Sequence, residues 1–493
     1  MISTSSSSTA AIGRATRRGG ILFPDCTSRR GDRWVDRTEA AGLAFPVYGL
    51  GVAVGDYDND GDPDLYLTAL GPDRLLRNNG DGTFTEVTHR AGIANPEFAS
   101  SAAWFDADND GWLDLYVANY VQWSPETDIF CSLDGVTKSY CTPEPYRGVS
   151  DRFYRNNGDG TFTDATEASG LYDPTSKSLG VVAFDYNLDG AMDLFVANDT
   201  EPDKLFENLG NGTFAEVGML AGVAFDENGV ARAGMGVDVG DVERSGHWFL
   251  AVTNFSNEMI SLYRSEGNGL FIDRAQAMRI GPPSLPTLGF GCFFFDADGD
   301  GWLDLFAVNG HVEPEIERVQ PTVAYRQRPH LFWNREGRVF VDVAEEAGFT
   351  APLVGRGAAY GDLDGDGDLD VVITENGGPA RIYRNDSERG ALLRVRLVGR
   401  RSNRDAIGAM VRVTANGLAL TQMVRGGGSY CSQSEYTLTF GLGEGTVAQE
   451  VLVRFPKGTV YRLNEVPAEQ TLVVDEERGV VQVLPFRSKG AKE

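Results

Sequence analysis

Histidine and cysteine are scarce in this 493-residue sequence, which has four histidines and five cysteines. So few histidines leave little material for acid–base chemistry. No Gly-x-Ser-x-Gly elbow, phosphate loop or dinucleotide fingerprint occurs in a setting that would support one. These absences argue against a classical hydrolase and leave any catalytic residues unknown.

Positive charge and long apolar runs are also in short supply. The sequence has 44 Lys and Arg against 71 Asp and Glu, a formal net charge of −27. So acidic a chain, with no basic stripe, should repel nucleic acid and anionic membranes, and we expect neither as a partner. The apolar segments, such as "LGFGCFFF" at 288–295, fall short of the roughly 18 residues of a membrane helix. We expect no membrane insertion, and a monomer is the working assumption.

The N-terminal segment lacks the apolar core of a secretory signal. Its first 20 residues, "MISTSSSSTAAIGRATRRGG", are rich in Ser and Arg and contain no acidic residue. We expect residues 1–33 to form a disordered tail. A misplaced start codon or a non-classical export route are the alternatives.

Aspartate, by contrast, is concentrated in short loops. In "GDYDNDGDPDLYLT" at 55–68, aspartates alternate around Gly61 and lead directly into a strand-like segment. Carboxylates at the first, third and fifth positions of such a loop converge on a hard, oxygen-seeking cation such as Ca²⁺. An EF-hand would need a Glu at its twelfth position, which is Leu67 here, and helices on both sides. The pattern therefore predicts a calcium loop that joins two β-strands.

The acidic loop recurs along the chain, with intact copies at 56–64, 106–114, 185–193, 296–304 and 362–370. Copies of one motif at intervals along a chain indicate a fold built from repeated units. A sixth copy at 241–249 has Glu243, Ser245 and Phe249 at ligand positions, so we predict that this loop has lost its ion. The five intact loops predict about five Ca²⁺ ions, which would shift the formal charge from −27 to −17. The predicted ligands are Asp56, Asp58, Asp60, Asp64, Asp106, Asp108, Asp110, Asp114, Asp185, Asn187, Asp189, Asp193, Asp296, Asp298, Asp300, Asp304, Asp362, Asp364, Asp366 and Asp370.

Each repeat extends beyond its loop. A strand of small residues precedes the loop, as in "SLGVVAFD", and an aromatic strand with an Asn-Gly or Asp-Gly turn follows it, as in "FYRNNGDGTF". Each unit therefore predicts about four short strands, as in a β-propeller blade whose innermost strand needs small side chains. Six units are visible. Residues 120–150 or the termini could supply a seventh blade.

Two families carry the same motifs. Residues 34–388 resemble the FG-GAP or VCBS-type calcium-binding propeller repeats. Farther on, "SNRDAIGAMVRV" (402–413), "RGGGSYCSQSE" (425–435), "FGLG" (440–443) and "VRFPKG" (453–458) resemble the ASPIC/UnbV domain. The combination is similar to the cartilage acidic protein family and its bacterial relatives.

The resemblance implies an all-β chain. A calcium-loop propeller at 34–388 would be followed by a small β-sandwich-like domain at 389–486 and a short tail at 487–493. The sequence departs from the family in the damaged loop at 241–249 and in Cys431, where an apolar residue is more usual. Family membership implies a fold and calcium, and it implies no activity.

Calcium affinity and cysteine placement both bear on the compartment. Extracellular calcium modules bind with constants of roughly 10⁻⁴ to 10⁻³ M, so five sites at about 1 mM calcium would add about 2 to 7 kcal/mol to stability. In a resting cytosol this contribution would nearly vanish, so we expect an extracellular or periplasmic location. Cys131 and Cys141 lie in a long irregular insertion that a disulfide would tie down, although two unpaired thiols are the alternative.

Four predicted strands end in an equivalent asparagine, which suggests a shared polar face. One interpretation is that each Asn caps its own turn. The other is that these ends form a ligand-binding face around the propeller axis, with long inserts after Asn119 and Asn309 rising on the same side and "YCTPEPY" at 140–146 as a roof. The candidate ligand-binding residues are Asn119, Asn198, Asp199, Glu201, Asn254, Asn309, His311 and Glu313.

Two classes of function are compatible with these features. The first is a calcium-stabilised, secreted binding or adhesion protein that recognises a protein or glycan through its propeller loops. The second is an enzyme, lyase-like or cyclase-like and acting in natural-product biosynthesis, that uses the axial face.

Overall fold

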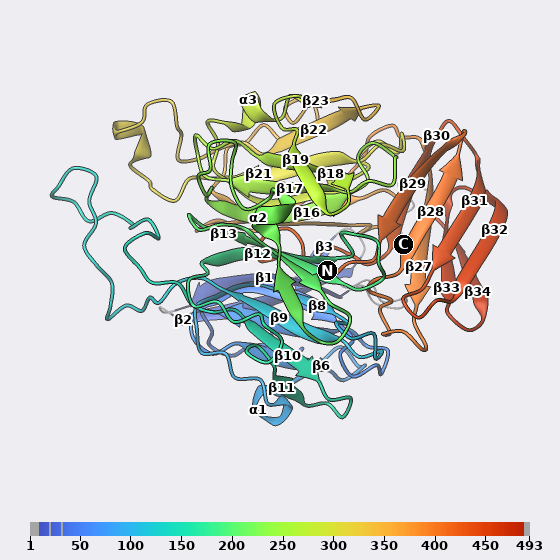
Figure 1. The fold of residues 1–493 in the computed structure, drawn as a ribbon, viewed down its shortest axis with the longest axis horizontal. Coiled ribbons are helices and arrows are strands. Elements are labelled where there is room, and N and C mark those ends of the chain that lie inside the picture. Colours follow the sequence, from blue (N-terminus) through green and yellow to red (C-terminus); the bar gives the residue numbers. More distant parts are fainter. Residues whose placement is uncertain (1–8, 19–20, 31–32, 488–493) are drawn as a thin grey trace.

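The computed structural model describes residues 9–18, 21–30 and 33–487, with side chains from residue 34 onward. The chain is all-β: a ring of antiparallel sheets carries a separate domain of two sheets at one side (Figure 1). As the repeats predicted, this is a β-propeller followed by a β-sandwich-like domain.

Six sheets correspond to the six sequence repeats, and in each the strands follow one another in chain order. The first three sheets are β4 (Gly49–Gly55), β5 (Asp64–Ala69), β6 (Arg74–Asn78) and β7 (Phe84–Glu86); β8 (Ala99–Phe105), β9 (Asp114–Asn119), β10 (Arg152–Asn156) and β11 (Phe162–Asp164); and β12 (Ser178–Phe184), β13 (Asp193–Asn198), β14 (Lys204–Asn208) and β15 (Phe214–Glu216). The next three are β16 (Gly234–Gly240), β17 (Phe249–Asn254), β18 (Ser261–Gly267) and β19 (Leu270–Asp273); β20 (Gly289–Phe295), β21 (Asp304–Asn309), β22 (His330–Arg335) and β23 (Val339–Asp342); and β24 (Gly355–Gly361), β25 (Asp370–Glu375) and β26 (Arg381–Tyr383).

The first strand of each sheet lies innermost and packs against the first strand of the next sheet. The crowding explains why these strands carry small residues. A Cβ on Gly180 would lie 2.1 Å from the carbonyl oxygen of Met235, and one on Gly236 would lie 2.0 Å from that of Phe290. Glycine is therefore required where neighbouring inner strands approach closely.

The N-terminal segment corrects one expectation. Residues 1–33 were expected to be a disordered tail, but β1 (Thr9–Arg18), β2 (Ile21–Arg30) and β3 (Arg33–Asp36) pair antiparallel as a three-stranded sheet, and β1 lies beside β4. Pairing among these three strands, together with the packing of β1 beside β4, supplies order that the local composition did not suggest. A further sheet is thus added at the N-terminus, whereas residues 120–150 form only isolated bridges.

The helices are short: α1 (Thr88–Ala91), α2 (Gly218–Ala221) and α3 (Gly281–Ser284) follow the outer strands, and the 3₁₀ turn η1 (Ile316–Arg318) lies in the insert between β21 and β22. Gly92 and Gly222 end α1 and α2 in the left-handed conformation, with φ of 76° and 82°. Within the described residues, no helix has the length and apolar character needed to cross a bilayer.

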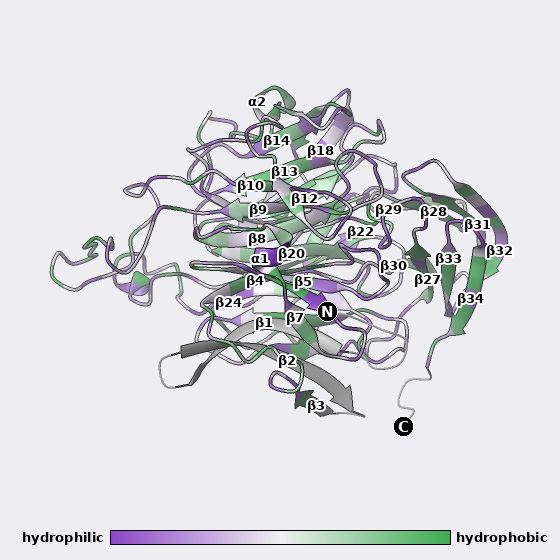
Figure 2. Ribbon diagram, turned by 90° about the horizontal axis from the view of Figure 1, so that it is seen from below, coloured by the Kyte–Doolittle hydropathy of each residue, from purple (hydrophilic) through white to green (hydrophobic). Residues whose placement is uncertain are grey.

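The C-terminal domain consists of two four-stranded sheets. One sheet contains β30 (Leu438–Gly443), β27 (Ala391–Val398), β33 (Gln470–Asp475) and β34 (Gly479–Pro485), and the other contains β29 (Leu418–Met423), β28 (Met410–Ala415), β31 (Val447–Arg454) and β32 (Val460–Pro467). Leu393 and Val411 belong to the same continuous apolar core as Trp104 of the propeller. The domain is therefore packed on the propeller, at the side opposite the long inserts (Figures 1 and 2). Of the tail expected at 487–493, only Arg487 is described.

Candidate metal loops and ligand face

The acidic loops share one backbone geometry. The first aspartate of each loop accepts the N–H of the sixth-position glycine, as in Asp56 Oδ2 to Gly61 N (2.8 Å) and Asp296 Oδ2 to Gly301 N (2.9 Å). It is buried in every loop except that at 362–370, where Asp362 is half-buried. The fourth residue adopts a left-handed conformation, with φ of 57° at Asn59. This curl turns the side chains of alternate residues inward.

Four loops bring three carboxylates together, with one oxygen from each lying within 4.8 Å of the others. These groups are Asp56, Asp58 and Asp64; Asp106, Asp108 and Asp114; Asp296, Asp298 and Asp300; and Asp362, Asp364 and Asp366.

The donor set fits a hard cation. Asp56 Oδ1 and Asp296 Oδ1 are buried without a hydrogen-bond partner in the protein, a costly arrangement that a bound cation would relieve. Burial, followed by the charge of Asp405, raises the pKa of Asp56 to about 8. Oxygen-only ligands of this kind suit Ca²⁺ better than the transition metals.

The remaining predicted metal loop, at 185–193, has the same curl with an amide at its third position. Asp185 Oδ2 accepts the N–H of Gly190 (2.8 Å), and Asn187 Nδ2 donates to Asp189 Oδ2 (3.0 Å). Asp193, in the ninth position, is fully buried. Three carboxylates and one amide oxygen are thus available in this loop.

The ninth-position aspartates depend on a partner that sequence reasoning missed. Asp114 accepts the backbone N–H groups of Ala107 (2.9 Å) and Asn156 (2.8 Å), and the Asn156 side chain donates to the carbonyl of Tyr57 in the preceding loop (2.9 Å). Equivalent residues occur in five repeats, at Asn78, Asn156, Asn208, Asn334 and Asn385. The repeated Asn before the hairpin turn in "RNNGDGTF" was the available signal. All but Asn78 tie one loop to the loop of the neighbouring blade.

The four predicted ligand-face asparagines do end equivalent strands, β9, β13, β17 and β21, and all are buried. Their amides brace local backbone: Asn119 Nδ2 donates to Ser150 O (2.9 Å), Asn254 Nδ2 to Met259 O (2.8 Å) and Asn309 Nδ2 to Arg328 O (2.7 Å). Asn198 Oδ1 accepts the N–H of Lys177 (2.8 Å). Of these partners, only Met259 lies in the turn that directly follows its asparagine, so turn capping and ligand binding by the asparagines both stay predictions.

The other predicted face residues form two small groups. Tyr120 donates to Asp199 Oδ2 (2.6 Å), while Glu201 pairs with Lys177 (3.1 Å). His311 Nδ1 accepts the N–H of Glu313 (3.0 Å), and burial lowers the pKa of His311. A neutral imidazole in this tautomer carries its proton on Nε2. Asp199 Oδ1 and His311 Nε2 are both buried without a hydrogen-bond partner.

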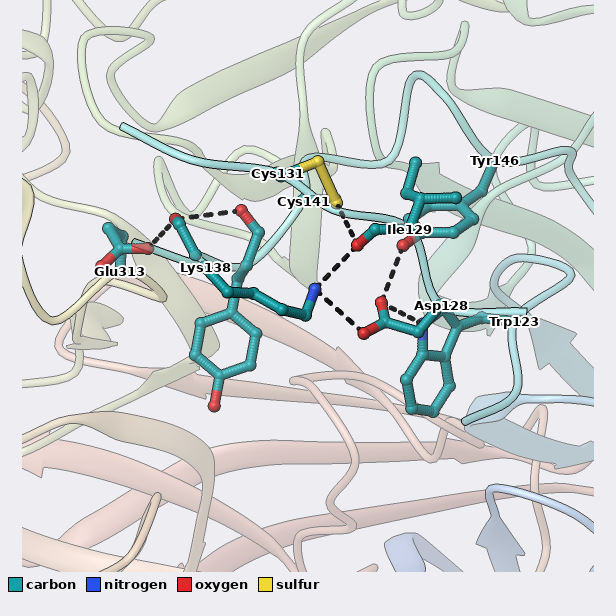
Figure 3. Close-up of a disulfide and its surroundings, with 10 residues drawn as sticks. Trp123, Asp128, Ile129, Cys131, Lys138, Cys141, Tyr146 and Glu313 are labelled. Atoms are coloured by element: carbon teal, nitrogen blue, oxygen red, sulfur yellow. Dashed lines mark hydrogen bonds and ion pairs between the residues drawn. A yellow bond between two sulfur atoms is a disulfide. The ribbon is translucent and has the colours of Figure 1, made fainter. Parts of the chain in front are cut away.

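The long inserts meet above this face. Cys131 and Cys141 form the predicted disulfide, and Lys138 pairs with Asp128 (2.9 Å) inside the same insert (Figure 3). The insert also reaches the second one, because Ser139 Oγ donates to Glu313. The two inserts therefore lie on the same side of the propeller, as expected (Figure 1).

The propeller axis contains a segment of the C-terminal domain, whereas we expected an open pocket there. Residues 426–436 of the C-terminal domain run along the inner strands, with β-bridges between Gly427 and Val182 and between Ser429 and Val237. This part of the chain therefore occupies the axis between the inner strands, and a pocket lined by Asn198, Asn309 and His311 stays a prediction. Sequence periodicity carried no sign of so long-range an insertion.

These observations define a class: a propeller of acidic-loop repeats with a β-sandwich domain on its loop side. The chain matches the FG-GAP-like repeat over residues 56–117, 128–196, 185–248 and 322–373, and the ASPIC and UnbV domain over residues 399–481. It belongs to the family of FG-GAP-repeat proteins with a C-terminal ASPIC and UnbV domain, which includes cartilage acidic protein 1.

Cartilage acidic protein 1 from Homo sapiens is 26% identical over 306 residues, covering 58% of this chain and 42% of the human protein. The Xenopus tropicalis protein is 26% identical over 293 residues, with 58% and 42% covered. The chain thus spans less than half the length of these relatives.

Two solved structures are also similar. An Agrocybe aegerita lectin, described as recognising non-reducing terminal N-acetylglucosamine, has a TM-score of 0.41 and 15% identity, with 74% of this chain and 92% of the lectin covered. YCF48 bound to D1 peptide has a TM-score of 0.41 and 8% identity, with 78% and 97% covered.

Proposed function

We propose that the protein is a calcium-stabilised, extracytoplasmic binding or adhesion protein. Its ligand, a protein or glycan, is bound at the face formed by the ends of β9, β13, β17 and β21 under the disulfide-tied insert. Calcium ions occupy the five intact loops on the opposite side of the propeller, where they hold the blades in register.

The observation that carries this proposal is the pair of unsatisfied buried atoms on the insert side. Asp199 Oδ1 accepts a hydrogen bond when its carboxyl is ionised, and His311 Nε2 can donate one. Buried polar groups without partners are rare and call for an explanation. A sugar hydroxyl or a peptide backbone offers both a donor and an acceptor. Phe255, whose ring lies 5.3 Å from that of His311, adds an apolar surface of the kind that binding sites use.

The test is a glycan array and a displayed peptide library probed with the full chain in calcium. For the best binder, Asp199→Asn and His311→Ala should each weaken binding about tenfold or more, because one buried hydrogen bond is lost. Glu450→Gln, on the C-terminal domain, is the matched control and should leave binding intact. Unchanged affinity in both face variants would place the ligand site elsewhere.

A further inference from the structure

The C-terminal domain rests on the loop side of the propeller and contacts its acidic loops directly. These polar contacts join Asp56 N to Asp405 Oδ2 (2.7 Å), Lys457 Nζ to Asp110 O (2.8 Å), Thr421 N to Asp241 Oδ2 (3.3 Å), Gly390 N to Asp298 O (2.8 Å) and Arg394 Nη1 to Asp362 Oδ2 (2.6 Å). The candidate cation sites are thus part of the interface between the two domains.

From this interface, one segment enters the propeller. We call residues Gly426–Tyr436 the axial segment. It contacts inner strands around the ring: Cys431 N donates to Ser101 Oγ of β8 (3.0 Å), Ser429 Oγ donates to Ala358 O of β24 (2.6 Å), and Tyr436 donates to Val54 O of β4.

The fit in the channel is close. A Cβ on Gly426 would lie 1.7 Å from the carbonyl oxygen of Trp104. Next to it, Arg425 forms a two-pronged ion pair with the buried Asp238 of β16, at 2.8 and 2.7 Å. Such a pair fixes the geometry more than it adds stability. The axial segment therefore has one defined seat in the channel.

The middle of the axial segment, at Tyr430, reaches the candidate ligand face. The Tyr430 ring lies 5.0 Å from that of Phe290, and the Arg356 guanidinium lies over the same Phe290 ring at 4.1 Å. Arg356 also donates to the carbonyl oxygen of Gly310 (2.9 Å), the residue before His311. One continuous segment thus connects the loop side of the propeller with the insert side.

The loop at 56–64 is both a candidate cation site and a contact point for the C-terminal domain. Its first aspartate donates its backbone N–H to the Asp405 carboxylate, which adds a negative charge to a loop that already holds five aspartates. Without a cation these carboxylates repel one another. In β4, directly before this loop, Val54 accepts the hydrogen bond from Tyr436. The loop at 106–114, in contrast, receives no carboxylate from the C-terminal domain in the described residues, and contacts Lys457 instead.

We propose that a divalent cation in the loop at 56–64 locks the axial segment in the channel, and thereby holds Tyr430 at the ligand face. The C-terminal domain is then a calcium-dependent plug of the propeller. This inference rests on the cation binding included in the proposed function, but not on the identity of the ligand.

The test is hydrogen exchange of the full chain, followed by mass spectrometry at a temperature well below melting. In calcium, the double variant Asp58→Asn/Asp60→Asn should lose one bound ion and exchange about tenfold faster across the axial segment, as expected for local opening. Neither substituted residue takes part in the hydrogen bond from Asp56 N to Asp405 Oδ2, so that contact itself is retained. The matched control Asp108→Asn/Asp110→Asn removes the same charge from the next loop and should leave exchange of the axial segment within about twofold of wild type.

Strand β18, for which the described residues show no hydrogen bond to the axial segment, serves as the internal reference, and bound calcium is counted in each sample. Equal exchange rates in wild type and Asp58→Asn/Asp60→Asn, despite loss of the ion, would overturn the proposal. So would equal acceleration in both double variants or in β18, since that would be general loosening. If wild type binds no cation at the loop, the premise fails, and the ion count distinguishes that result from failure of the coupling.

Discussion

The loops at 241–249 and 296–304 occupy equivalent places in neighbouring blades, yet they satisfy their first aspartate in different ways. Asp296 uses Oδ2 for the N–H of Gly301, and Oδ1 is buried without a partner. Asp241 uses both oxygens: Oδ1 accepts the N–H of Ser245 (2.9 Å), and Oδ2 accepts those of Gly246 (3.0 Å) and Thr421 (3.3 Å).

The other positions of the loop at 241–249 also contact groups of the protein or have lost their ligand side chain. Glu243, at the third position, turns outward to pair with Arg264 (2.8 Å). Arg244, at the left-handed fourth position, lies over the Trp302 ring of the neighbouring loop at 5.3 Å. Phe249 replaces the ninth aspartate, and Ser265 replaces the asparagine that would have bound it. The comparison teaches that a blade can keep the loop shape by replacing the ion with its own donors and a guanidinium.

The largest expected effect is that of chelation. Removing calcium should lower the free energy of unfolding by about 2 to 7 kcal/mol, because five loops lose their ions and their carboxylates repel. Thermal melts of the full chain with calcium and with excess chelator measure this. A melting temperature that does not respond to chelator would show that bound calcium does not stabilise the five intact loops. These loops would then not differ in this respect from the loop at 241–249.

The next effect should come from Asp241→Ala. This change leaves three backbone N–H donors without their acceptor, and we expect the free energy of unfolding to fall by about 1 to 3 kcal/mol. Because no ion is involved, the loss should be the same in calcium and in chelator, and the number of bound ions should stay at five. Denaturant unfolding under both conditions checks this, and a loss seen only in calcium would mean that this loop does bind an ion.

The matching substitution in the neighbouring loop should behave in the opposite way. Asp296→Ala should remove one ion and the stability that it contributes, roughly 0.4 to 1.4 kcal/mol at about 1 mM calcium. The difference from wild type should shrink in chelator. Equal destabilisation with and without calcium would show that Asp296 acts only as a structural acceptor.

The smallest effect concerns Glu476, a carboxylate of the C-terminal domain that is satisfied by backbone donors and is no part of an acidic loop. Burial raises the pKa of Glu476, but the N–H groups of Ser402, Arg400 and Arg401 outweigh it, and the folded-state pKa is lowered. Its stabilising contribution is therefore present above the unfolded-state pKa of about 4.3 and is lost as pH falls through the folded-state value.

Glu476→Gln should reduce stability at neutral pH by about 1 kcal/mol or less. It should also flatten the stability profile below about pH 4.5. Unfolding in chelator from pH 7 to pH 3 measures this without interference from calcium. A variant profile that parallels wild type throughout would show that Glu476 does not contribute.

Much of the fold was predictable from sequence because it is written in local, repeated patterns. The acidic loops, the small-residue inner strands and the Asn-Gly turns each specify one supersecondary unit, and six copies identified the propeller. The Cys131–Cys141 pairing followed from closeness in the chain and is present in the structure.

The features that were missed depend on contacts between distant parts of the chain. Arg425 meets Asp238 across 187 residues, and Asp405 meets Asp56 across 349. Neither partner has a local pattern that points to the other. The axial segment was visible only as a glycine-rich motif, and its glycines are explained by the crowded channel that it enters. The sheet at the N-terminus likewise depends on pairing that composition does not reveal.

The most direct test of the account is to locate the ions. Crystals of the full chain grown in calcium, measured for anomalous scattering, should show five peaks, in the loops at 56–64, 106–114, 185–193, 296–304 and 362–370, and none in the loop at 241–249. A peak beside Asp241, or the absence of peaks from the five intact loops, would contradict the claim that the loops with Asp or Asn at the third position and Asp at the fifth and ninth positions are the cation sites.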